Sequence, residues 1–168
     1  MDQQTSSHPA AQNATSVERK GERELVVTRT FDAPPGIVFK AWSNAEIFRQ
    51  WWVPKGAPMT LLACDMDVRT GGKYCLEFAA GGQSMKFYGK YLDVVPGERI
   101  VWTNDEGDEE GAVTTVTFQD RSGKTLLTFH ELYPTSEARD EAMNGAAAGL
   151  PTQLDQLAEL LPTLGAAL

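Results

Sequence analysis

Few residues of this 168-residue sequence could carry acid–base chemistry. His130 and Glu131 are neighbours in a run of alternating apolar residues that predicts a strand. Because neighbours along a strand point to opposite faces, this imidazole and this carboxyl cannot pair as base and acid. The sequence also shows no serine, histidine and aspartate arrangement typical of a hydrolase. We therefore predict no catalytic residue and expect a structural role for His130.

Metal and cofactor chemistry find no better support. Cys64 and Cys75 flank a predicted hairpin, and two thiols without clustered histidines fall short of the four ligands of a zinc site. We expect both thiols to be free and half-buried. The acidic loop 104–111 lacks the ligand spacing and the distant glutamate of a calcium loop, which indicates a solvated hairpin tip. No glycine-rich phosphate loop precedes a helix. The sequence predicts no metal and no cofactor.

The charge balance limits the possible partners. The chain carries 23 acidic and 15 basic side chains, a net charge of −8, which repels nucleic acid and anionic lipid. No run approaches the ~20 apolar residues of a membrane span, and the N-terminus lacks the pattern of a signal peptide. We expect a cytoplasmic protein without a nucleic-acid partner.

One domain accounts for most of the chain. Residues 1–22 are rich in small and polar residues and carry almost no large apolar side chain, so we expect a flexible tail there. Residues 23–163 have the length and composition of a single domain. This domain must position any functional residue.

The start of the domain predicts one strand and two short helices. Residues 24–31 are rich in β-branched side chains and alternate, which favours a strand. The sequence Asp32-Ala33-Pro34-Pro35 is a helix start, with Asp32 as the acceptor side chain. Ser43 and Glu46 have the spacing of a capping box, which predicts a second short helix.

The rest of the domain predicts a meander and a long helix. Alternating runs between turn residues predict six more strands, at 60–69, 73–80, 85–95, 99–103, 113–119 and 125–132. Their short connections require antiparallel neighbours. Thr135 or Ser136 can cap a helical region that Gly149 and Pro151 interrupt, and the leucines that follow recur at helical spacing. We predict an α+β fold in which a long C-terminal helix lies on a curved, seven-stranded antiparallel sheet.

This order of elements resembles the helix-grip fold of the START-like superfamily. Five patterns in the right order are similar to the family of the C-terminal domain of the Hsp90 ATPase activator, and they imply a stand-alone, bacterial-type member over about residues 24–161. The patterns are Phe31-Asp32-Ala33-Pro34 with Val38 and Trp42; Trp51-Trp52; Asp67-Val68-Arg69-Thr70-Gly71-Gly72-Lys73-Tyr74; Gly89-Lys90-Tyr91 with Pro96-Gly97-Glu98-Arg99-Ile100-Val101; and Thr114 to Phe118.

The sequence departs from the family at two places. A histidine usually ends the last strand in the family, whereas His130 and Glu131 stand here in uncertain register, so neither receives a role from the resemblance. Leu150-Pro151 stands where many members have Gly-Trp, so the resemblance does not determine the shape of the helical wall of any pocket.

The resemblance implies a function. In this superfamily the gap between helix and sheet is typically an apolar cavity, so we expect non-catalytic binding of a hydrophobic or amphipathic small molecule, lipid-like or aromatic. Strand alternation and helix spacing then propose the lining. The proposed ligand-binding residues are Trp42, Phe48, Trp52, Tyr74, Leu76, Phe78, Phe87, Tyr91, Trp102, Phe118, Phe129, Leu150, Leu154 and Leu157.

Several alternatives stay open. Each of these aromatic residues also fits a plain core, and Gly89 in mid-strand fits a bulge, a close backbone approach or room for a ligand. Arg69 is expected to pair with Asp67, the alternative being a charged residue at the pocket mouth. A protein-interaction module like the Hsp90 co-chaperone is a second function. A cyclase- or hydrolase-like enzyme is a third, and it requires Glu131, His130 or Asp67 to face the cavity.

Overall fold

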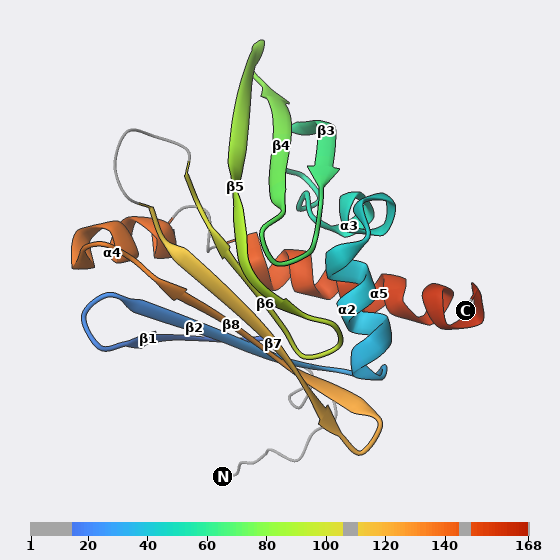
Figure 1. Cartoon of the computed structure of the whole chain (residues 1–168). Helices are drawn as coiled ribbons and strands as arrows, with labels where there is room; N and C mark the ends of the chain where they lie inside the picture. The colour runs from blue at the N-terminus through green and yellow to red at the C-terminus, as the bar shows by residue number, and fades with distance from the viewer. Residues whose placement is uncertain (1–14, 106–110, 145–148, 168) are drawn as a thin grey trace, which may run out of the picture.

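The computed structural model describes residues 15–105, 111–144 and 149–167. Within these residues the chain forms one antiparallel sheet of eight strands in the order β1-β2-β8-β7-β6-β5-β4-β3, together with four helices (Figure 1). The elements are β1 (Ser16–Lys20), β2 (Glu24–Phe31), α2 (Pro35–Ser43), α3 (Ala45–Trp51), β3 (Thr60–Met66), β4 (Lys73–Ala80), β5 (Gln83–Val95), β6 (Arg99–Thr103), β7 (Val113–Arg121), β8 (Lys124–Leu132), α4 (Ser136–Asn144) and α5 (Leu150–Ala167).

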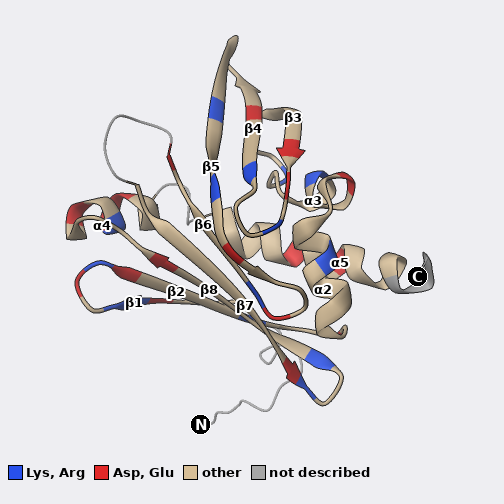
Figure 2. Ribbon diagram, viewed as in Figure 1, with Lys and Arg blue, Asp and Glu red and all other residues tan. Residues whose placement is uncertain are grey.

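The sheet curves around the helices. Figure 1 shows α5 running behind the sheet, α2 and α3 at one side of it, and α4 near the ends of β2 and β8. Figure 2 shows charged residues along β4 and β5, while the middle of β7 carries none. We call the face covered by α2, α3 and α5 the inner face; Val27, Val116 and Leu127 on it are fully buried. The α+β helix-grip arrangement predicted from the sequence is confirmed.

The strand that the sequence analysis missed is β1. All seven predicted strands are present, but Ser16–Lys20 pairs with β2 inside the stretch that we expected to be a tail. That part of the tail prediction is wrong, and residues 1–14 lie outside the described residues. All five side chains of β1 are exposed, so backbone hydrogen bonds to β2 hold this edge strand without a buried face. An edge strand of this kind leaves no apolar alternation to detect.

The two short helices follow each other as predicted, but their caps differ. Pro34 precedes α2 without any side-chain cap, so Asp32 does not have the capping role expected of it. Asn44, not Ser43, caps α3, because its Oδ1 accepts a hydrogen bond from the Ile47 N–H at 3.2 Å. At α4, the Thr135 hydroxyl accepts from the Ala138 N–H at 3.0 Å, which confirms one of the two predicted caps.

Polar contacts fix α5 over the inner face. Arg29 of β2 is only 8% exposed and donates to Oδ1 of Asp155 at 2.5 Å. The Gln156 amide of α5 donates to the carbonyls of Trp51 and Val53 at 2.9 Å, where α3 ends. These contacts satisfy carbonyls that a helix end leaves free. They also fix the helical layer over the sheet, with Leu154 and Leu157 fully buried beneath α5.

Candidate functional site

A row of cross-strand partners on the inner face combines aromatic and polar side chains. Tyr91 pairs with Trp102, Trp102 with Thr114, and Thr114 with Glu131. Direct partners in an antiparallel sheet share a face, with Cβ atoms about 5 Å apart. The row therefore crosses β5, β6, β7 and β8 and ends on a carboxyl group, next to Leu25 of β2.

An aromatic cluster lies beside this row, centred on Trp42 of α2. The Trp42 ring lies 4.8 Å from Trp51, 6.1 Å from Trp102 and 6.2 Å from Phe129, measured between ring centroids. Trp42 is only 2% exposed, and among the described residues its indole N–H has no hydrogen-bond partner. A buried donor without an acceptor costs about 1–3 kcal/mol. The cluster therefore contains one donor for which the fold supplies no acceptor.

Glu131 is the carboxyl group of the row. Its Oε2 accepts a hydrogen bond from the Thr114 hydroxyl at 2.7 Å, and its Oε1 accepts one from the Tyr133 hydroxyl. Burial raises the pKa of the Glu131 carboxyl, and the two hydrogen bonds offset this rise only in part. Burial and the nearby Glu131 also raise the pKa of Tyr133, which keeps its proton. Glu131 can therefore hold or exchange a proton on the inner face of the sheet.

A hydrogen-bonded chain continues from Glu131 across the sheet. The Asn104 amide donates to the Thr114 hydroxyl at 3.1 Å and to the Ala112 carbonyl at 2.8 Å. The Tyr74 hydroxyl donates to the Thr103 carbonyl at 2.7 Å and lies 3.4 Å from Oδ1 of Asn104. Each member orients the next, so the chain holds the Glu131 carboxyl in one position.

The predicted ligand-binding residues fall into two groups by burial. Ten are buried: Trp42, Phe48, Leu76, Phe78, Tyr91, Phe118, Phe129, Leu150, Leu154 and Leu157. Four are half-buried and pack against that core: Trp52, Tyr74, Phe87 and Trp102. Ring contacts join Phe48, Trp52, Trp102, Phe118 and Phe129 to Trp42, whereas Phe78 with Phe87 and Tyr74 with Tyr91 form separate pairs. The structure thus brings together six of the fourteen residues in one cluster, Trp42 included.

The sequence analysis did not assign a role to the polar members of the site. Thr114, Asn104 and Tyr133 were absent from the predicted lining, and Glu131 received no role. The signal for Glu131 was present, because the alternation that places Phe129 inward also places the residue two positions later on that face. The other three become visible only when their strands pair.

The remaining candidate acids and bases lie elsewhere. His130 points to the outer face, where its Nε2 lies 2.8 Å from Oε1 of Glu24, and this contact lowers the pKa of Glu24. The prediction that His130 and Glu131 cannot pair is confirmed. Asp67 forms an exposed ion pair with Arg69 at 2.9 Å, as predicted. Of the three residues that an enzyme on this fold would need, Glu131 lies on the inner face.

Both cysteines are free and half-buried, as expected. Cys64 Sγ lies 3.4 Å from the sulfur of Met66. In the part of the chain that the structure describes, no three His, Cys, Asp or Glu side chains gather in a way that could hold a metal ion. None of the helices described there is both long and apolar enough to span a membrane.

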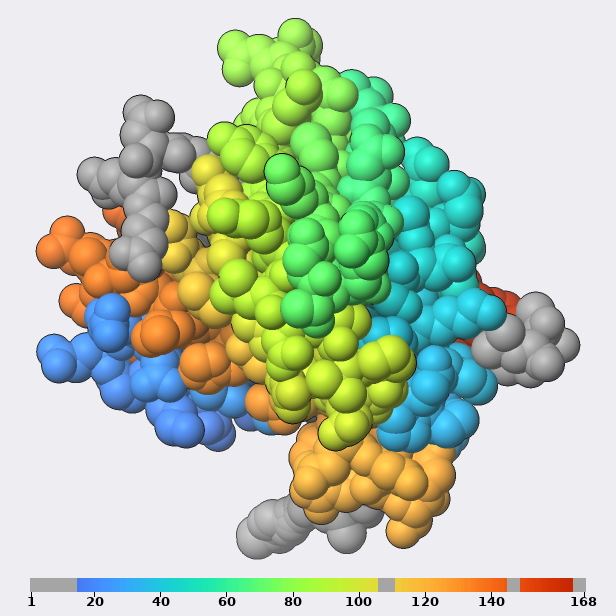
Figure 3. Space-filling view, in the orientation of Figure 1, coloured from blue at the N-terminus to red at the C-terminus, as the bar shows by residue number. Residues whose placement is uncertain are grey.

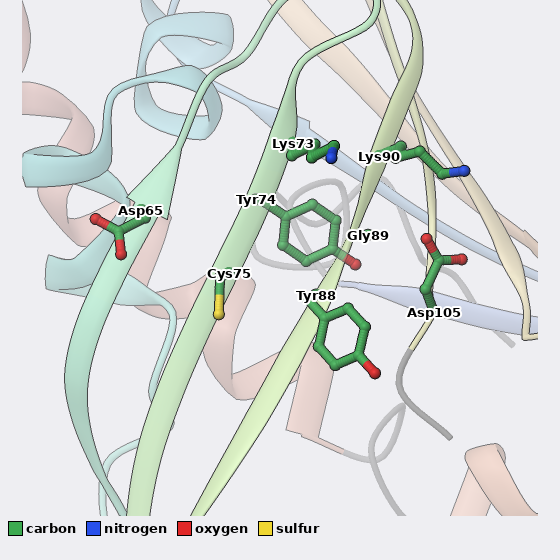
Figure 4. Close-up of a pocket in the computed structure, with 8 residues that line it drawn as sticks. All are labelled: Asp65, Lys73, Tyr74, Cys75, Tyr88, Gly89, Lys90 and Asp105. Atoms are coloured by element: carbon green, nitrogen blue, oxygen red, sulfur yellow. The ribbon is translucent and has the colours of Figure 1, made fainter. Parts of the chain in front are cut away.

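An open pocket of about 440 Å³ lies over β3, β4 and β5 (Figure 4). It is also lined by Asp105, which stands two residues after the end of β6. Cys75 pairs with Asp65 and Tyr88, and Lys73 pairs with Lys90, on the face opposite the buried Leu76. This pocket is therefore separate from the inner-face site, although it shares Tyr74 with the predicted lining. Its lining residues are Asp65, Lys73, Tyr74, Cys75, Tyr88, Gly89, Lys90 and Asp105.

Comparison with known protein families shows to which family the chain belongs. The family model described as activator of Hsp90 ATPase homolog 1-like protein matches residues 32–162, well over half of the sequence. The chain belongs to this family. The resemblance noted from the sequence motifs is thereby confirmed, and the matched range includes the aromatic cluster, the polar row and α5 up to its Pro162.

Solved structures of bacterial proteins share the fold of this member of the Hsp90 activator-like family. A protein from Rhodobacter sphaeroides has 20% identity and a TM-score of 0.79, with 89% of this chain and 99% of that chain covered. One from Nitrosomonas europaea has 25% identity and a TM-score of 0.77, covering 88% and 99%. One from Chromobacterium violaceum has 29% identity and a TM-score of 0.70, covering 84% and 98%. No curated protein matches the chain significantly.

Proposed function

We propose that this protein binds an amphipathic small molecule, with an apolar or aromatic body, between the inner face of the sheet and α5, without chemical conversion. The observation that carries the proposal is the indole N–H of Trp42, which is buried among aromatic rings with no acceptor among the described residues. A bound molecule with an acceptor atom would supply the missing hydrogen bond.

The surroundings of Trp42 support this reading. Small-molecule sites are mostly apolar and contain a few converging polar groups that orient the ligand. Here Trp52 and Trp102 contact Trp42 and are only half-buried, so their rings keep surface that a ligand could cover. The hydrogen-bonded Glu131 and Thr114 lie on the same face as Trp102 and supply the polar part.

Native mass spectrometry of the protein purified from its own host tests the proposal first. A retained adduct would give the mass of the ligand. Nitrogen-15 spectra then follow the indole N–H signals during titration with fatty acids, isoprenoids and flavonoid-like aromatics. We expect saturable shifts at Trp42 and Trp102. If no adduct is retained and no member of the panel moves these signals, the proposal is overturned.

Two matched variants locate the binding site. Trp42→Phe and Trp51→Phe each remove one indole N–H from the same cluster, but the Trp51 N–H already donates to the Ala41 carbonyl at 3.1 Å. We expect the first variant to weaken binding of any ligand found and the second to leave its affinity within about threefold. Equal losses would mean that the N–H of Trp42 does not contact the ligand.

A second candidate function is protein interaction. Leu62, Met85, Tyr88 and Leu92 of β3 and β5 are between 41% and 52% exposed. Figure 3 shows these strands projecting at the top of the molecule. Exposed apolar side chains can contribute to protein-binding surfaces, and the matched family is described by an activator of the Hsp90 ATPase. Capture of the host's purified Hsp90 by the wild type, and its loss in Tyr88→Ser/Leu92→Ser, would support this function over ligand binding.

A further inference from the structure

The geometry points to a ligand whose polar end is a protonated amine received by the Glu131 carboxylate. This inference rests on the proposed function, because it specifies the chemical class of the molecule bound at the same inner-face site. It is carried by the partners of Glu131, by the contacts that other cations of the protein already make, and by the strand spacing between Glu131 and the aromatic cluster.

The partners of Glu131 are neutral. Thr114 and Tyr133 donate hydroxyl groups to its two oxygens, and no Lys, Arg or His forms an ion pair with it among the described residues. A carboxylate has about four acceptor positions, so two remain for a ligand. An ammonium group carries donors and the opposite charge, and it is therefore the best match for a half-buried carboxylate without a cation.

The nearby cations of the protein are already used. Arg29 lies on the inner face but is paired with Asp155 of α5 at 2.5 Å. His130, the chain neighbour of Glu131, is paired with Glu24 on the outer face. Arg139 of α4 is buried beside the Gly21 and Glu24 carbonyls and Asp140. The fold therefore leaves the charge of Glu131 to be balanced by something that binds.

The body of the ligand would lie along the row of partners. Trp102 is two strands away from Glu131, which is roughly 10 Å at the spacing of adjacent strands. Between them lies the hydroxyl of Thr114, which is fully buried and already bonded to Asn104 and Glu131. An amine with an arylalkyl chain of this length would place its ammonium at Glu131 and its ring beside Trp102 and Trp42.

The burial that raises the pKa of Glu131 supports the same conclusion. An ammonium beside the carboxylate would stabilise its charged form and so return the pKa toward its ordinary value. A bound cation would therefore favour the deprotonated form of Glu131, and a bound anion would favour the protonated form.

Three soluble probes of one shape test the inference: 3-phenylpropylamine, 3-phenylpropanol and 3-phenylpropanoate. Each is titrated into nitrogen-15-labelled wild-type protein at neutral pH while the Trp102 and Trp42 indole signals are followed. We expect the amine to bind about tenfold more tightly than the alcohol, the ratio given by one charge-assisted hydrogen bond, and the carboxylate to bind most weakly. Equal affinities for amine and alcohol, or tighter binding of the carboxylate, would overturn the inference.

Two variants of equal charge change separate a local contact from general attraction to an acidic protein. Glu131→Gln removes the inner-face charge and keeps the shape of the side chain. Glu77→Gln removes a charge from β4 on the outer face, between the inward Leu76 and Phe78. We expect the first to lose about tenfold in amine affinity and the second to stay within about twofold. An equal loss in both variants would show that amine binding follows only the net charge.

These results distinguish the inference from the function on which it rests. If the alcohol binds at Trp102 without any preference for the amine, ligand binding holds and the amine class is wrong. If none of the three probes shifts the inner-face signals and no adduct is retained from the host, the proposed function itself fails. The wild-type comparison of the probes needs no variant, so a failure of Glu131→Gln to fold would not affect it.

Discussion

Trp42 and Trp51 lie ring against ring, 4.8 Å apart, yet of these two indole N–H groups only that of Trp51 has an acceptor among the described residues. The acceptor is the carbonyl of Ala41 in the last turn of α2, where backbone carbonyls lack helical partners. The N–H of Trp51 therefore has a structural role. The N–H of Trp42 has no acceptor among the described residues and could donate to a bound molecule.

This difference predicts unequal stabilities for two like substitutions. Trp51→Phe leaves the Ala41 carbonyl unpaired in a buried position, whereas Trp42→Phe removes a donor that had no partner. Both leave a similar cavity, so we expect Trp51→Phe to be the more destabilising by about 1–2 kcal/mol. Urea unfolding of the two variants measures the difference. Equal losses, or a greater loss for Trp42→Phe, would mean that the Trp42 N–H is bonded in solution.

Glu131 predicts a pH dependence of stability. A carboxyl whose pKa is raised by folding adds stability that is fully present below its ordinary value of 4.5 and is lost as pH rises through the raised value. Thr114 does not titrate, and Tyr133, whose pKa is also raised, keeps its proton. The free energy of unfolding of the wild type relative to Glu131→Gln should therefore fall as the pH rises above about 4.5.

Denaturant unfolding at several pH values measures this difference. His130 and Glu24 are present in both proteins, so their contact with each other is common to both. A difference that stays flat with pH, or that rises, would show that the carboxyl is not desolvated in the folded protein.

Gly89 predicts a steric effect where β5 meets β6. A Cβ built at this position would lie 2.1 Å from the Thr103 carbonyl oxygen, the oxygen that also accepts from Tyr74. Of the three readings that the sequence left open, the close backbone approach is the one that the structure supports. Gly89→Ala should destabilise the protein by about 1–3 kcal/mol, because the backbone must move.

A second glycine gives the matched control for this change. Gly36 in α2 has open space around its Cβ position and an ordinary φ. Gly36→Ala should leave stability unchanged or raise it by about 0.5 kcal/mol, through helix propensity and a less flexible unfolded chain. Thermal unfolding of both variants gives the comparison. A tolerated Gly89→Ala would mean that β5 and β6 lie further apart than in the structure.

Strands and helix caps could be predicted from the sequence where local residue patterns mark their ends. The strands at 24–31, 73–80 and 99–103 were predicted to the residue, because apolar alternation or clear turn residues mark their ends. The edge strand β1 has no buried side chain and gave no such signal. The cap of α3 was placed one residue early, since Ser43 and Asn44 are both good caps and only the backbone decides between them.

The site divides in the same way. Alternation is a local property, and it placed Phe129 and, by extension, Glu131 on the inner face. The bonds from Asn104 to Thr114 and from Thr114 to Glu131 join residues 10 and 17 positions apart on different elements. No local pattern specifies such bonds, because they depend on the register of β7 against its neighbours. The aromatic lining was therefore open to prediction, and the polar chain was not.

The ion pair that holds α5 to the sheet gives the last prediction. Asp155 and Glu159 both lie on α5 and both pair with a cation outside it, Arg29 and Lys55 respectively. Arg29 is 8% exposed and its pair is 2.5 Å long, whereas Lys55 is 79% exposed and its pair is 3.5 Å long. Removing the partner of the buried Arg29 guanidinium lowers the free energy of unfolding more than removing a surface ion pair does. The difference is reduced because Asp155 is 66% exposed and solvent screens its charge.

We therefore expect Asp155→Ala to destabilise the protein by about 1–2 kcal/mol and Glu159→Ala by less than about 0.5 kcal/mol. Both changes replace an acid by alanine on one helix, so the net charge changes alike; the gain in helix propensity is slightly larger at Asp155, which works against the expected order. Urea unfolding at low and high salt checks the assignment, because salt screens the exposed Lys55 pair more than the buried Arg29 pair. Equal losses in the two variants would mean that α5 is held by its apolar face and by the amides of Gln153 and Gln156, with no contribution from the charge on Arg29.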